Sequence, residues 1–156
     1  MKEHQIKAIH RNFSFFSYNN SVAKSKKEKQ YNRVMKITFW GKVRHGAKRG
    51  RLLGFPTANM KLHMAVSEGI YISEVKIENT IYPSVTFVGN ARTFGEMDYK
   101  AESYILDFTR EIYGKWLTVT LLVKIRSNKK FDSQESLIHQ MDKDILAARK
   151  FFNKIK

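Results

Sequence analysis

The feature that most constrains the fold is a run late in the chain in which apolar residues recur at every second position. Apolar side chains occupy every second position of this run, at Leu117, Val119, Leu121, Val123 and Ile125. A period of two indicates a β-strand with one buried face. Shorter runs with the same rhythm cover residues 35–43, 71–77, 85–87 and 104–108, and turn residues such as Glu78-Asn79 and Tyr113-Gly114 separate them. Five short strands at hairpin spacing, without helices between them, predict an antiparallel barrel or sandwich.

The last part of the sequence changes to a helical period. Apolar residues recur every three or four positions there, at Leu137, Met141, Ile145, Ala148 and Phe152. This spacing predicts an amphipathic helix that packs its apolar face on the barrel. Asp132 is the predicted N-cap of this helix, because Glu135 follows it at the spacing of a capping box.

Residues 1–35 differ in composition from the rest of the chain. They contain an aromatic cluster between Phe13 and Tyr18, followed by a charged run at 24–29. Such a run is typical of a solvated helix face or a linker, and the segment contains no catalytic pattern. We therefore expect residues 1–35 to form a basic N-terminal extension and residues 36–156 to form the barrel with its C-terminal helix.

The chain is strongly basic, with 29 Lys and Arg residues against 14 Asp and Glu residues and a net charge of +15. Such an excess is compatible with nucleic-acid binding, since Lys and Arg neutralise phosphates. The charge is spread along the sequence, however, which favours general basicity together with an anionic small-molecule ligand. There is no cysteine, no apolar run of ~18 residues and no apolar core of a secretory signal. We expect a soluble, cytoplasmic protein with no specific nucleic-acid partner and no membrane partner.

One glycine-rich, basic segment has the composition of a phosphate-binding loop. Gly46, Gly50 and Gly54 recur at four-residue spacing, and Lys48 lies among the basic residues between them. Glycine lets backbone N–H groups approach an anion closely, and such loops bind phosphates. Basic, glycine-rich turns are also common without any ligand, so the composition alone is a weak signal.

The residues that follow this segment offer oxygen ligands for a metal ion. Pro56 stiffens the backbone just before Thr57. The Thr57 hydroxyl and the Asn59 carboxamide are hard oxygen ligands suited to Mg²⁺. An ordinary turn after Pro56, with Asn59 as its cap, explains the same residues equally well.

Glu102 is the candidate general base. It shares strand parity with Tyr104, Leu106 and Phe108, so its carboxylate is expected on a buried face. Burial disfavours the charged form of a carboxylate, which suits a proton acceptor. The alternative is a structural glutamate at the barrel rim, paired with one of the many lysines.

Several common catalytic signatures are absent from the sequence. It contains neither the G-x-x-x-x-G-K-[ST] phosphate loop nor the G-x-S-x-G motif of hydrolases. The histidines lack the spacing of metal ligands and are expected on the surface. They are His4, His10, His45, His63 and His139.

The order of the remaining motifs resembles the riboflavin kinase family, best known as the C-terminal domain of bacterial bifunctional riboflavin kinase/FMN adenylyltransferases. The resemblance extends from about Thr38 to Phe151. Its most specific segments are G-F-P-T-A-N at 54–59 and E-S-Y-I-L-D-F at 102–108. Further matching segments are G-K-V-R-H-G-A-K-R-G at 41–50, V-G-N-A-R-T-F-G at 88–95, I-R-S-N-K-K-F at 125–131 and D-K-D-I-L-A-A-R at 142–149.

The resemblance implies ATP-dependent phosphorylation of the riboflavin 5′-hydroxyl to give FMN, with Mg²⁺ as cofactor, and a six-stranded antiparallel Greek-key barrel with a C-terminal helix. Thr57 and Asn59 match the residues that hold the Mg²⁺–nucleotide, and Glu102 matches the catalytic base. The loop through Gly46, Lys48, Gly50 and Gly54 matches the one that wraps the ATP phosphates. Arg126 matches an arginine in a mobile flap near the flavin.

The chain departs from the family pattern in three places. Tyr104 stands where many members have histidine, although tyrosine also occurs. Arg92 stands where the family usually has proline before Thr93-Phe94, so this loop is expected to be less rigid. Residues 1–35 are far too short for an adenylyltransferase domain, so FAD synthesis is not expected of this chain. Two alternatives stay open, a flavin- or nucleotide-binding barrel with weak or no kinase activity and a basic nucleic-acid-binding barrel. The latter predicts stacking aromatics on one exposed sheet face, whereas most aromatics here share parity with aliphatic residues.

Overall fold

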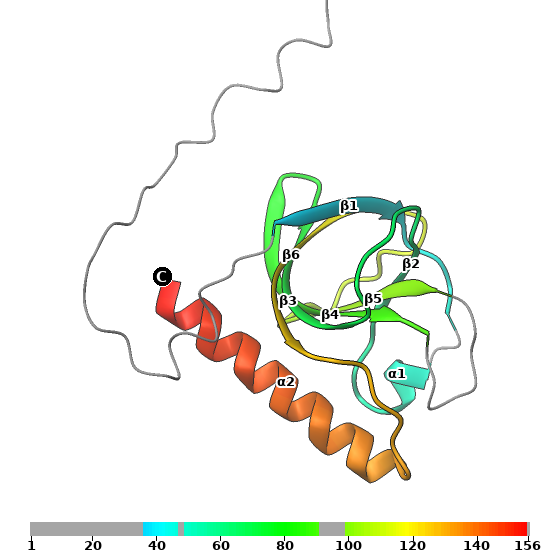
Figure 1. Ribbon diagram of the computed structural model, residues 1–156. Coiled ribbons are helices and arrows are strands. Elements are labelled where there is room, and N and C mark those ends of the chain that lie inside the picture. The colour runs from blue at the N-terminus through cyan, green and yellow to red at the C-terminus, as the bar shows by residue number, and fades with distance from the viewer. Residues whose placement is uncertain (1–35, 47–48, 91–98, 156) are drawn as a thin grey trace, which may run out of the picture. The chain divides into compact units, whose positions relative to one another are not determined.

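The structure is a computed structural model that describes residues 36–46, 49–90 and 99–155. The expected N-terminal extension, Lys48 and Arg92 lie outside these residues. The described residues form one six-stranded antiparallel sheet, curled into a barrel, and two helices (Figure 1). The strands are β1 (Ile37–Lys42), β2 (Ala58–Lys61), β3 (Gly69–Ile77), β4 (Thr80–Gly89), β5 (Lys100–Ile105) and β6 (Trp116–Arg126).

The strand order is β1-β6-β3-β4-β5-β2, with every neighbouring pair antiparallel. In this order each of β3 and β4 pairs with the strand that follows it in the chain, and β6 returns to lie beside β3. This is the Greek-key arrangement. An isolated bridge between Arg44 and Asn59 joins the chain after β1 to β2. This bridge brings the two edges of the sheet together, so the expected six-stranded barrel is confirmed.

Two expectations about the elements were wrong. The short helix α1 (Arg49–Leu52) interrupts the expected all-strand order within the glycine-rich segment. The strand expected at 104–108 instead covers Lys100–Ile105 as β5. It ends at Ile105 and is followed by a turn at Leu106 and Asp107, in which Asp107 has a φ of 55°. The expected turns at Glu78-Asn79 and Tyr113-Gly114 are present, with positive φ at Glu78 and Gly114.

Apolar side chains are buried in two separate clusters. One fills the barrel and includes Tyr71, Val75 and Leu121. The other lies between the barrel and helix α2 (Gln134–Ile155), where Ala148 and Phe152 pack against residues such as Ile72, Val85 and Leu122. The apolar stripe of the predicted helix therefore packs on the barrel as expected, and Figure 1 shows α2 running alongside the barrel.

The N-cap of α2 is Ser133, one residue after the predicted Asp132. The Ser133 hydroxyl accepts a hydrogen bond from the Ser136 backbone N–H at 3.1 Å, because the helix begins at Gln134. The pKa of Glu135 is lowered by a hydrogen bond from its own backbone N–H and then by one from Ser133. An anionic side chain in the first turn also suits the helix dipole. Neither described helix is long and apolar enough to cross a membrane.

Candidate active site

The pairing of β2 with β5 brings the three predicted catalytic and metal-binding residues together. Asn59 lies opposite Glu102 in the register of these strands, and Thr57 immediately precedes β2. The Thr57 hydroxyl donates to Glu102 Oε2 at 3.2 Å. Asn59 Nδ2 donates to the Thr57 carbonyl at 3.2 Å and lies 3.4 Å from its Oγ1. These contacts use the Asn59 amide nitrogen and leave its carboxamide oxygen as an acceptor.

Two glycines of the basic segment pack tightly against this cluster. A Cβ built at Gly46 would lie 2.7 Å from the Asn59 side-chain oxygen. One built at Gly50 would overlap the backbone carbonyl oxygen of Phe55, whose N–H donates to the Gly50 carbonyl at 2.7 Å. Gly54 has a φ of 88°, which favours glycine for conformational reasons. The segment therefore needs glycine to fold closely over Thr57 and Asn59.

The expectation that Glu102 lies on the buried face of its strand was wrong. Ala101, Ser103 and Ile105 have the opposite parity and are the buried residues of β5. The Glu102 side chain is 24% exposed, and its Oε1 forms an ion pair with Lys100 Nζ at 2.9 Å. The ion pair that the structural alternative predicts is thus present, beside the hydrogen bond from Thr57.

A cavity of about 680 Å³ extends from this cluster to helix α2. Gly46, Thr57, Asn59 and Glu102 line its polar part. Its lining also includes apolar side chains of the barrel, of the helix and of the segment between β6 and α2, namely Ile70, Phe87, Tyr104, Phe131, Met141 and Ile145. A volume of this size is typical of small-molecule sites, which combine an apolar lining with a few polar groups.

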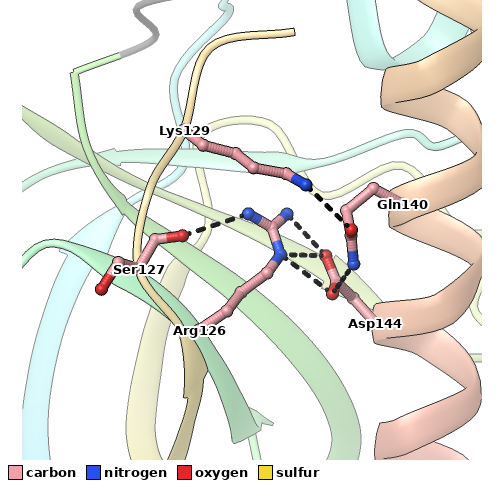
Figure 2. Close-up of polar contacts among 5 residues, drawn as sticks. All are labelled: Arg126, Ser127, Lys129, Gln140 and Asp144. Carbon is pink, nitrogen blue, oxygen red and sulfur yellow. Dashed lines mark hydrogen bonds and ion pairs between the residues drawn. The ribbon is translucent and has the colours of Figure 1, made fainter.

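Arg126 also lines this cavity. It is the last residue of β6, and an ion pair holds its guanidinium to Asp144 of α2 (Figure 2). Nε lies 3.0 Å from each carboxylate oxygen, and Nη2 lies 2.7 Å from Oδ2. In the described structure this arginine is therefore fixed between the end of a strand and a helix.

The sequence interpretation missed Lys100 and Asp144 as residues of this region. Asp144 carried a usable signal, since it lies within the apolar stripe of the predicted helix, between Met141 and Ile145. A carboxylate at such a position needs a buried partner. Lys100 had no comparable signal, because any of many lysines could have paired with Glu102.

The described histidines show no sign of a metal site. His45, His63 and His139 are exposed, as expected, and the His45 ring stacks on Tyr113 with centroids 3.9 Å apart. His4 and His10 lie outside the described residues. In the part of the chain that the structure describes, no group of three or more His, Cys, Asp or Glu residues could hold a metal ion.

Curated relatives match most of the chain. It is 37% identical over 130 residues to the trifunctional protein RibF/MnmA of Mycoplasmoides gallisepticum, covering 80% of this chain and 20% of that protein. It is 38% identical over 117 residues to the bifunctional riboflavin kinase/FMN adenylyltransferase of Haemophilus influenzae, covering 73% of this chain and 38% of that protein. The chain thus spans only a minor part of the length of these relatives.

Solved structures share the fold. A structure named as a macrolide-efflux protein from Streptococcus pneumoniae has a TM-score of 0.66 and 35% identity, covering 73% of this chain and 38% of that one. The riboflavin kinase of Trypanosoma brucei has a TM-score of 0.54 and 24% identity, covering 78% of this chain and 84% of that one. The family model described as Flavokinase, riboflavin kinase, matches residues 33–152. That match covers most of the chain, which therefore belongs to the riboflavin kinase family.

Proposed function

We propose that this protein transfers the γ-phosphoryl group of ATP to the 5′-hydroxyl of riboflavin, giving FMN and ADP. The observation that carries the proposal is the cluster of Thr57, Asn59 and Glu102, joined by hydrogen bonds, in a cavity that also has an apolar wall. A phosphoryl donor suits the polar part, and a flat, largely apolar ring suits the wall. Family membership supports the same reaction.

Glu102 is the proposed general base. In the described structure each of its oxygens has one protein partner, Lys100 or Thr57, so lone pairs remain for a substrate hydroxyl. The carboxylate would take the proton of the 5′-hydroxyl as that oxygen forms a bond to the γ-phosphorus. The bond between the γ-phosphorus and the bridging oxygen breaks, and ADP leaves with the electron pair. Positioning and electrostatics carry most of the catalysis in such transfers.

The donor set fits Mg²⁺ bound together with nucleotide phosphates. The Thr57 hydroxyl and the Asn59 carboxamide oxygen are hard ligands, and Mg²⁺ takes few protein ligands besides phosphates and waters. When bound, the ion would offset negative charge on the phosphates. Gly46, Gly50 and Gly54, together with Lys48, are the proposed contacts to those phosphates. Gly46 and Gly50 lie against Asn59 and Thr57, and Gly54 and Lys48 belong to the same basic segment of the sequence. Arg126 is the proposed contact to the flavin, because it lines the cavity with the apolar residues.

The reaction is tested by incubating the purified protein with riboflavin and Mg-ATP and separating the flavins by chromatography. We expect FMN to form, and its formation to stop when a chelator removes Mg²⁺. FMN formation that is unchanged by the chelator would contradict the proposed roles of Thr57 and Asn59. We further propose that the protein acts in the cytoplasm, where ATP is abundant, without a membrane partner.

One observation favours a second candidate function, the binding of single-stranded nucleic acid. Trp40 and Trp116 are 68% and 65% exposed. Trp40 pairs with Thr118, and Trp116 pairs with Lys42, across β1 and β6, so the two indoles lie diagonally on one outer face. Most aromatic residues were expected on the same strand face as aliphatic residues, which argued against nucleic-acid binding, but these two tryptophans lie on the exposed face. Exposed aromatic side chains beside lysines can stack on bases. Titrating the protein with an oligonucleotide while following tryptophan fluorescence tests this candidate.

A further inference from the structure

Asp144 is a buried carboxylate on the apolar face of α2. It is 5% exposed, and Met141 and Ile145 beside it line the cavity. Removing a carboxylate from water is costly unless charged hydrogen-bond donors satisfy it. A buried ion pair is weak evidence for stability in itself, so its placement at the cavity wall suggests a role in the site.

The contacts of Asp144 show that it acts on Arg126 and not directly on a ligand. Among the described residues its two oxygens receive the Nε and Nη2 groups of Arg126 and Nε2 of Gln140, the last at 3.1 Å. These donors occupy both oxygens (Figure 2). Arg126 also donates from Nη1 to the Ser127 carbonyl at 3.3 Å. Of its five N–H groups, two are left without a protein acceptor within the described residues.

The same network fixes the segment that connects β6 to α2. Lys129 Nζ donates to Gln140 Oε1 at 3.3 Å, so the Gln140 amide joins Lys129 to Asp144 (Figure 2). The guanidinium of Arg126 and the ammonium of Lys129 lie 5.7 and 4.8 Å from the centre of the Phe131 ring. The orientation of Arg126 is therefore set from the helix side and from the connecting segment.

We infer that Asp144 is a positioning residue for flavin binding. It holds the planar guanidinium of Arg126 in one orientation and neutralises its charge, so that the two remaining N–H donors serve carbonyl oxygens of an uncharged ring. A bidentate arginine–carboxylate pair supplies this geometric control. The inference rests on the proposed function, because it takes the flavin ring as the ligand of the apolar wall.

The test compares Asp144→Asn with Asp107→Asn. The first variant keeps the size of the side chain but loses the charge-assisted pairing. We expect KM for riboflavin to rise about tenfold, the order that the loss of one or two hydrogen bonds produces. We expect kcat and KM for ATP to stay within about twofold, because the polar cluster is untouched. An unchanged KM for riboflavin would overturn the inference.

Asp107→Asn is a matched control. It breaks a second ion pair between the barrel and α2, in which Arg149 Nη2 and Nη1 lie 2.7 and 2.9 Å from the Asp107 carboxylate. This exposed pair does not line the cavity, and asparagine tolerates the positive φ of residue 107. All kinetic constants should stay near those of the wild type. A rise in KM for riboflavin equal to that of Asp144→Asn would overturn the inference, since it would trace the effect to helix anchoring.

A double-mutant cycle shows whether Asp144 acts through Arg126. Asp144→Asn should add less than about twofold to the KM of an Arg126→Ala protein, because the residue it positions is gone. Additive effects would overturn the inference.

Arg126→Lys keeps the positive charge but loses the planar, two-pronged guanidinium. It should raise KM for riboflavin as Asp144→Asn does, and it replaces Asp144→Asn if that variant does not fold. If the wild type makes no FMN, the proposed function fails. The Kd of riboflavin, measured by flavin fluorescence, then replaces KM. An equal Kd for the wild type and for Asp144→Asn would overturn the inference independently of the proposed function.

Discussion

Replacing Glu102 with glutamine should separate catalysis from folding. Glutamine keeps the length of the side chain and an oxygen that can accept the hydrogen bond from Thr57, but it cannot take a proton at neutral pH. A general base contributes typically ~10²- to 10⁴-fold to the rate, equivalent to about 3–5 kcal/mol of barrier. We expect kcat to fall by a factor in that range.

The expected effect on stability is much smaller. Glu102→Gln removes the ion pair with Lys100, in which both side chains are partly exposed, at 24% and 17%. Partly solvated pairs of this kind are worth about 0.2–1 kcal/mol after screening. A fully desolvated carboxylate would have made the variant more stable than the wild type, but the observed ion pair predicts a slight loss. That loss is small beside a typical folding free energy of ~5–15 kcal/mol.

The assay measures initial rates of FMN formation at saturating substrates, together with chemical unfolding of both proteins. We expect near-normal affinities for riboflavin and Mg-ATP. A variant that turns over at the wild-type rate would refute the assignment of Glu102 as the base. A variant that is unfolded under assay conditions would show that Glu102 has the structural role of an ion-pair partner at the barrel rim.

The remaining predictions concern the metal ligands, the N-terminal segment and the basic charge. Thr57→Ala and Asn59→Ala should each weaken Mg²⁺-dependent nucleotide binding with the fold intact, as calorimetry can measure, and unchanged binding in both would exclude them as ligands. A truncated protein beginning near Arg33 should fold and keep kinase activity, and a folded but inactive product would place part of residues 1–35 in the site. Binding to RNA or DNA should be weak, insensitive to sequence and steeply lost with added salt. Tight, sequence-selective binding at physiological salt would contradict this.

The regular elements with strong periodicity could be predicted from the sequence. The alternation of β6 and the apolar stripe of α2 both reflect burial of one face, and both elements are present as expected. Strand β2 escaped prediction because it has only four residues, Ala58–Lys61, which show no long alternation. Its pairing with β5 is what brings Asn59 opposite Glu102. The proximity of these two residues was therefore implied only by the resemblance to the family.

The wrong expectation for the face of Glu102 has a physical cause inside the barrel. Four fully buried hydroxyl groups, those of Ser73, Ser84, Thr86 and Ser103, line part of its interior. They are joined at 2.7–2.8 Å, and Ser84 also donates to the Ser73 carbonyl at 2.9 Å. Because these groups satisfy one another, polar residues occupy interior positions without an uncompensated cost. The positions of the apolar residues along β5 therefore do not identify which of its faces points into the barrel.

The formation of FMN and ADP by the purified protein in one incubation with riboflavin and Mg-ATP tests the central claim most directly. If the protein transfers the γ-phosphoryl group to riboflavin, the two products appear together in equal amounts, and neither forms when riboflavin or ATP is left out. Riboflavin that stays unphosphorylated while ATP remains intact would contradict the proposed kinase activity and favour a barrel that only binds its ligands. ADP that forms without FMN would show that the phosphoryl group is transferred to another acceptor.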